Sequence, residues 1–127
     1  MEKIVVQTAR APRPVAPYSQ AIAIDNLLFC SGQIGLDPET NKLVSEDVTE
    51  QTQQVLKNLS AVLSEAGCSK KDVVKVTVFL TDMKDFAAVN AVYSDFFSTP
   101  YPARTAFSVA GLPLGARVEI EAIAHFH

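Results

Sequence analysis

The spacing of apolar residues between positions 47 and 66 predicts an amphipathic α-helix. The apolar residues recur at intervals of seven, four and three: Val48, Val55, Leu59, Val62 and Ala66, with Leu56 and Leu63 alongside. Asp47 and Glu50 have the spacing of a capping box, and Gly67 stands where a glycine commonly ends a helix. We therefore expect a helix that starts at Asp47 and ends just before Gly67.

Stretches that are rich in β-branched residues or alternate between apolar and polar positions predict six strands. They cover residues 3–7, 19–24, 27–32, 72–80, 104–109 and 117–126. The turn dipeptide at 25–26 makes a hairpin of the second and third strands. A second helix is expected at 82–97. The order β-β-β-α-β-α-β-β predicts a single α+β domain, residues 1–127, whose six-stranded mixed sheet carries two helices on one face.

The other face of this sheet has no helix to cover it, so we expect it to face water or another subunit. In the strand 72–80 we expect one apolar face, formed by Val74, Val76, Val78 and Leu80. In the strand 104–109, Arg104, Ala106 and Ser108 share a side, as do Glu119 and Glu121 in the last strand. We interpret these two sides as one mixed face that bears Arg104 and Glu119. Such a face suits self-association.

Composition and charge narrow the class of protein. With 48% hydrophobic and 20% charged residues, the chain is typical of a globular domain. Its net charge of −3 makes a nucleic-acid partner unexpected. Cys30 and Cys68 are far apart, outside any C-x-x-C motif, and are expected to be reduced. The N-terminus does not resemble a signal peptide, and no apolar run predicts a membrane span. We expect a cytoplasmic protein.

Arg104 and Glu119 are the first candidates for chemistry. They could form an internal ion pair. Alternatively, Arg104 could bind the carboxylate of a ligand through its planar fork while Glu119 positions a water molecule. Glu121 points the same way as Glu119, so alternation does not choose between the two glutamates.

Several other residues have both a structural and a functional interpretation. Asn90 interrupts an apolar helical stripe, and could either bond a neighbouring backbone group or line a pocket. Tyr18 follows a proline and could be loop packing, while Ser31–Gly32 could be a turn. His125 and His127 at the end of the chain make only a weak metal site.

Longer stretches of the chain resemble a known family. The stretches are "APYSQAI", "SGQIGLDPET", "DVVKVTVFLTDMKDFAAVN", "YPAR" and "GARVEIEAIA". In order and spacing they are similar to the RidA family, the reactive intermediate deaminases formerly called YjgF, including its animal-type members. The similarity runs from about residue 4 to about residue 124.

The resemblance implies a chorismate-mutase-like fold, a homotrimer with clefts between subunits, and no cofactor. It also implies hydrolysis of 2-imino acids, such as 2-iminobutanoate and 2-iminopropanoate, to 2-oxo acids and ammonia. In this family Arg104 would bind the substrate carboxylate and Glu119, rather than Glu121, would position water. The remaining residues of the cleft would be Tyr18, Ser31, Gly32, Asn90 and Ala106.

Two positions depart from common family patterns, and two other functions compete. Ala16 precedes Pro17 where many members have glycine, and Ala106 stands where many bacterial members have cysteine, which argues against thiol chemistry. A translation-inhibiting endoribonuclease is one alternative. The other is a non-catalytic, chaperone-like trimer that binds small carboxylates, which would keep Arg104 without needing Glu119.

Overall fold

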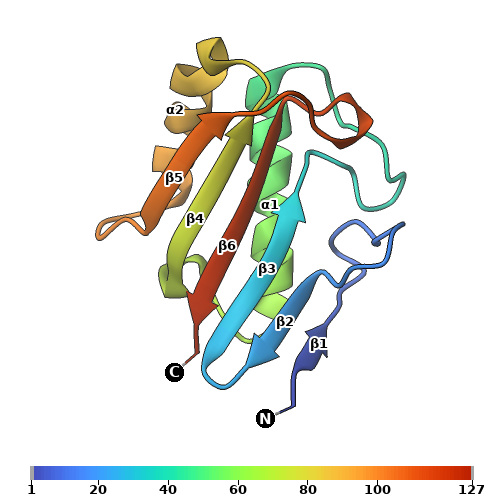
Figure 1. The fold of residues 1–127 in the computed structure, drawn as a ribbon, viewed down its shortest axis with the longest axis vertical. Helices are drawn as coiled ribbons and strands as arrows, with labels where there is room; N and C mark the ends of the chain where they lie inside the picture. Colours follow the sequence, from blue (N-terminus) through green and yellow to red (C-terminus); the bar gives the residue numbers. More distant parts are fainter. Residues whose placement is uncertain (1, 127) are drawn as a thin grey trace.

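A sheet backed on one side by two helices forms the architecture of residues 2–126, the part of the chain that the computed structural model describes (Figure 1). The strands and helices follow the predicted order: β1 Ile4–Val6, β2 Ala21–Ile24, β3 Leu27–Gln33, α1 Val48–Glu65, β4 Val73–Leu80, α2 Phe86–Phe96, β5 Ala103–Ser108 and β6 Val118–His125. The predicted α+β class, the six strands and the placement of both helices on one face are confirmed.

The strands lie in the order β1-β2-β3-β6-β4-β5. Every neighbouring pair is antiparallel except β4 and β5, which are parallel. A parallel pair needs a crossover, and α2 supplies it between these two strands. As a result β5 is an edge strand with α2 beside it, and β6 lies in the middle of the sheet (Figure 1).

The long helix α1 begins and ends where the sequence predicts. Oδ2 of Asp47 accepts a hydrogen bond from the backbone N–H of Glu50 at 3.0 Å, and Gly67 follows the helix with a φ of +83°. The capping box is only half formed, because the Glu50 carboxylate accepts from the hydroxyl of Ser45 instead. The face of α1 toward the sheet is fully buried at Val55, Leu59, Val62 and Leu63.

One expectation about β4 is wrong. Alternation through the strand places Val74 on the apolar face, but its side chain is 48% exposed and Val73 is buried in its place. The pairing of β4 with β6 shifts register between Val73 and Lys75, which is a bulge. A bulge adds one residue to one strand and reverses the alternation before it. From Val76 onward the predicted face is correct.

The sheet face that bears no helix, called the open face from here on, carries apolar side chains. Phe29 of β3 and Phe107 of β5 are each 42% exposed, and Phe79 of β4 meets Phe107 edge to face with ring centroids 5.4 Å apart. Aromatic rings left partly exposed on a sheet face are typical of a surface that another molecule covers.

Candidate functional site

Arg104 and Glu119 lie on opposite faces of the sheet. Arg104 pairs in register with Val76 of β4, whose fully buried side chain faces the helices. In β6, Val118 and Ile120 face the helices, so Glu119 between them points to the open face. The expected mixed face that bears both residues is therefore wrong, and so is the internal ion pair.

Helix α2 holds the Arg104 side chain in place. Nη1 of Arg104 donates to Oδ1 of Asn90 at 2.7 Å. The guanidinium carbon lies 4.7 Å from the ring centroid of Tyr93 and 5.5 Å from that of Phe86. Helical spacing brings these three α2 residues to one side of the helix, toward β5. Asn90 thus bonds to the arginine rather than to a neighbouring backbone group. We call these four residues the arginine cluster.

The charge of Arg104 is not neutralised within the described residues. No carboxylate of residues 2–126 lies within 4.0 Å of its guanidinium. Arg117 differs, because its Nη2 donates to both carboxylate oxygens of Asp85, at 2.7 and 2.9 Å. Ala106 lies two residues further along β5, on the same side as Arg104, and packs half-buried against the core. An oriented, exposed and unpaired guanidinium is suited to binding an anion.

Glu119 lies against the backbone of Gly32 on the open face. A Cβ atom added at Gly32 would come within 2.8 Å of the Glu119 carboxyl carbon and would clash with its Oε2. The missing side chain of Gly32 is thus the space that the carboxylate occupies. Burial raises the pKa of the Glu119 carboxyl, and the nearby charge of Glu121 raises it further. A raised pKa brings a carboxyl closer to the range in which it exchanges protons at neutral pH.

Tyr18 and Ser31 lie on the open face as well, beside Glu121 rather than Glu119. The hydroxyl of Ser31 donates to the backbone carbonyl of Ser19 at 2.6 Å, and Tyr18 is 51% exposed. Together with Glu121 they line a cavity of about 500 Å³ on the open face. The structure therefore divides the predicted residues into two groups. Asn90, Arg104 and Ala106 lie on the helix side, while the open face carries the glutamate cluster, which we define as Tyr18, Ser31, Gly32 and Glu119.

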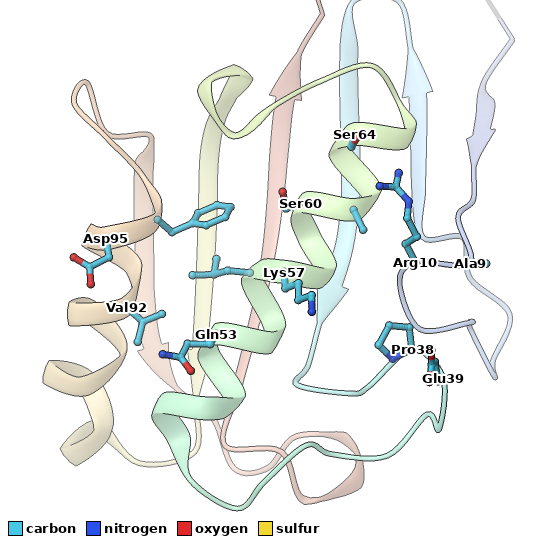
Figure 2. A pocket seen from close by; sticks show the side chains of 13 residues that line it. Ala9, Arg10, Pro38, Glu39, Gln53, Lys57, Ser60, Ser64, Val92 and Asp95 are labelled. Atoms are coloured by element: carbon cyan, nitrogen blue, oxygen red, sulfur yellow. The ribbon is translucent and has the colours of Figure 1, made fainter.

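A second, larger cavity contains none of the predicted residues. Its volume is about 900 Å³, and it runs along the outer side of α1 (Figure 2). Figure 2 shows Gln53, Val92 and Asp95 on the side of α1 toward α2, and Arg10 and Glu39 on the opposite side. Size alone does not mark this groove as the site, because a binding site also needs polar groups that converge on a ligand.

Within residues 2–126, the histidines and cysteines do not form a second cluster of reactive side chains. His125 is hydrogen bonded to Asn26 at 3.1 Å, while His127 lies outside the described residues. No three His, Cys, Asp or Glu residues of the described chain come close enough to hold a metal ion. Burial raises the pKa of the Cys30 thiol to about 12. Among the described helices, none is both long and apolar enough to span a membrane.

The sequence interpretation missed the role of two aromatic residues. Phe86 and Tyr93 belong to the apolar stripe that Asn90 interrupts, yet both rings lie against the Arg104 guanidinium. The aromatic character of the stripe was the signal, because an arginine guanidinium often lies over an aromatic ring.

Comparisons with known proteins agree on one family. The family model described as endoribonuclease L-PSP matches residues 8–126. The human 2-iminobutanoate/2-iminopropanoate deaminase is 49% identical over 120 residues, which cover 94% of this chain and 88% of the human protein.

Two solved structures give the same result. The structure of RidA from the Antarctic bacterium Psychrobacter has a TM-score of 0.94 and 47% identity, and the match covers 97% of this chain and 99% of that one. The Rid-family protein YyfA from Yersinia pestis has a TM-score of 0.95 and 46% identity, with coverage of 98% and 99%.

Proposed function

Because this chain belongs to the endoribonuclease L-PSP family, which includes RidA, we propose that it hydrolyses 2-imino acids such as 2-iminobutanoate and 2-iminopropanoate. In the reaction the protonated imine and one water molecule give a 2-oxo acid and an ammonium ion. The same activity is in the name of the human relative, which is 49% identical. Such imines are released by enzymes that eliminate groups from amino acids, so the activity would remove reactive intermediates.

The arginine cluster is the observation that carries this proposal. Asn90 occupies one edge of the Arg104 guanidinium, and the rings of Phe86 and Tyr93 lie against it. The rest of the fork stays exposed and has no acidic partner among residues 2–126. A carboxylate can then form two parallel hydrogen bonds to it. Every 2-imino acid carries such a carboxylate next to its reactive carbon.

Glu119 would act on the water molecule. Its carboxylate accepts a hydrogen bond from the water, aligns the oxygen with the imine carbon and receives the proton as the C–O bond forms. Glu119 then passes this proton to nitrogen. As the C–N bond breaks, the hydroxyl oxygen forms the C=O bond and its proton leaves with ammonia as an ammonium ion. The raised pKa of Glu119 suits this exchange. An iminium carbon is already electrophilic, so orientation of the two reactants is the main contribution required.

The arrangement of the two clusters supports a homotrimer. The arginine cluster and the glutamate cluster lie on opposite faces of one sheet, so one copy of the chain does not bring them together. A second copy whose open face covers the β5 edge of the first would do so. Three copies arranged head to tail close into a ring with three equivalent clefts. Tyr18, Ser31 and Gly32 would then form the wall of the cleft opposite Arg104 and Ala106.

Turnover of freshly generated imines tests the proposed function. An amino acid oxidase would produce 2-iminobutanoate, and its decay would be followed with wild-type protein, Arg104→Ala and Glu119→Gln. We expect wild-type protein to accelerate the decay, and both variants to fold normally and lose the acceleration. A wild-type protein that does not accelerate the decay would refute the function. Sedimentation that shows a stable monomer at micromolar concentration would refute the shared cleft.

The two alternative functions predict different outcomes, which RNA cleavage and 2-oxobutanoate binding assays would detect. An endoribonuclease, as the family description reads, would cleave RNA, although a net charge of −3 does not favour binding to a polyanion. A protein that only binds carboxylates would retain 2-oxobutanoate binding in Glu119→Gln and show no turnover even in its wild-type form. We also propose a cytoplasmic location, in keeping with the free thiols of Cys30 and Cys68.

A further inference from the structure

The Tyr93 side chain combines two features that its place in the core does not explain. Its ring lies 4.7 Å from the guanidinium carbon of Arg104, closer than the Phe86 ring at 5.5 Å. Its hydroxyl is buried and has no hydrogen-bond partner among residues 2–126. A buried hydroxyl without a partner opposes folding, so a phenylalanine would pack here at lower cost. The ring, in contrast, makes a contact that bears on function, because it lies against the guanidinium of Arg104.

The Tyr93 ring is itself held rigidly. Only 5% of the residue is exposed, and its centroid lies 4.7 Å from that of Phe97, which in turn lies 4.8 Å from that of Phe96. These three rings contact one another in turn, one pair tilted by 48° and the other edge to face at 89°, and these contacts restrict the orientation of the first ring. An arginine whose planar group lies on a fixed ring loses freedom of rotation about its long axis.

We propose that Tyr93 is a positioning residue for Arg104, with its ring supporting the guanidinium while Asn90 holds one edge. This inference rests on the proposed function, because it concerns the recognition of the substrate carboxylate. The two supports are of different kinds: Asn90 accepts a hydrogen bond from Nη1, and the guanidinium carbon lies over the Tyr93 ring. With both in place, the free N–H groups keep the geometry of a fork aimed at a carboxylate.

Binding of 2-oxobutanoate, the reaction product, measures this effect without turnover. We expect Tyr93→Leu, which removes the ring, to raise the Kd about 3- to 30-fold, the range of a cation–π contact. Tyr93→Phe keeps the ring, so its Kd should stay within about twofold of wild type, and its Tm should rise because the unpaired hydroxyl is gone. In turnover, Tyr93→Leu should raise KM much more than it lowers kcat, because the carboxylate is bound in both ground and transition states.

Phe96→Leu is the matched control. Phe96 belongs to the same group of three aromatic rings, but it contacts Phe97 and the ammonium group of Lys70 rather than Arg104. Its replacement should lower stability without changing the Kd. If Tyr93→Leu does not fold, Phe86→Leu takes its place, because Phe86 is only partly buried and its ring faces the same guanidinium. It should give a smaller rise in Kd.

Proton NMR gives a readout that does not depend on any ligand. The ring should shift the δ-methylene protons of Arg104 upfield in wild type and Tyr93→Phe, and the shift should disappear in Tyr93→Leu. An unchanged Kd and unchanged Arg104 shifts in Tyr93→Leu would overturn the inference. Equal losses in Tyr93→Phe would also overturn it, by assigning the effect to the hydroxyl. If wild type binds no 2-oxobutanoate, the proposed function is wrong, and the NMR shifts alone decide the role of Tyr93.

Discussion

Replacing Gly32 by alanine should inactivate the protein without unfolding it. The new Cβ atom would lie within 2.8 Å of the Glu119 carboxyl carbon and 3.0 Å of its Cγ, and it would overlap Oε2. Real Cβ atoms do not approach other heavy atoms this closely, so the carboxylate must rotate away. The backbone of Gly32 does not need a positive φ, so alanine fits the strand itself.

The size of the effect follows from this displacement. A catalytic group that is displaced by about 1 Å typically costs about 100-fold in rate, or about 2.7 kcal/mol in transition-state stabilisation. The free energy of unfolding should hold or rise, since a glycine-to-alanine change at a compatible position commonly stabilises a protein by about 0.4–1 kcal/mol. Gly32→Ala should therefore have a kcat/KM about 100-fold lower than wild type, with an equal or higher Tm.

The assay is imine turnover together with thermal unfolding and 2-oxobutanoate binding. Gly111→Ala is the control, because a Cβ added at Gly111 meets nothing within 4 Å, and it should behave like wild type. Binding of 2-oxobutanoate by Gly32→Ala should persist, because Arg104 is untouched. If Gly32→Ala keeps wild-type kcat/KM, then either Glu119 is not needed for turnover or it acts from a different position.

Three further changes test other contacts. Arg104→Lys should lower kcat/KM about 10- to 150-fold, since a single ammonium group does not reproduce the planar fork, and near-normal turnover would show that charge alone is enough. The carboxylate of Glu119 is active when ionised, so activity should fall as the pH drops through its raised pKa. Glu121→Gln removes one cause of the raised pKa and should move the loss of activity to lower pH. An unchanged pH profile would exclude Glu119 as the titrating group. Asp85→Asn weakens the two hydrogen bonds from Arg117 and should lower the free energy of unfolding by about 1–3 kcal/mol in urea, with no shift in the pH profile.

Local patterns predicted the helices and strands because each signal lies within a few residues. The periodicity of α1, the Asp47 cap and the glycine at position 67 all act over one or two helical turns. The bulge in β4 was not predicted because it depends on the partner strand. The register between β4 and β6 shifts between Val73 and Lys75, and no residue in the β4 sequence encodes that shift.

The expectation that the candidate site residues share one face of the sheet was wrong. Alternation grouped Arg104 with Ala106 correctly, yet it did not show which side of β5 faces the helices. We expected the side of β5 opposite Arg104 and Ala106 to be the core face, because it bears the large apolar side chain of Phe107. That expectation fails at an edge strand, where Phe107 stays 42% exposed beside Phe79 while the small Ala106 packs under α2. A face that another subunit covers has the hydrophobicity of a core, and sequence alone does not distinguish the two.

The separation of Arg104 and Glu119 on two faces of the sheet determines how mutant and wild-type chains would affect each other in a mixed oligomer. In the proposed head-to-tail ring each cleft would take its arginine from one chain and its glutamate from the next, so one defective chain would damage a cleft that it shares with a healthy neighbour. Conversely, two inactive chains, one lacking Arg104 and the other lacking Glu119, would complement each other. Mixed at random in equal amounts, they would restore roughly one cleft in four. In this protein the unit on which selection acts would be the junction between two chains rather than the chain itself.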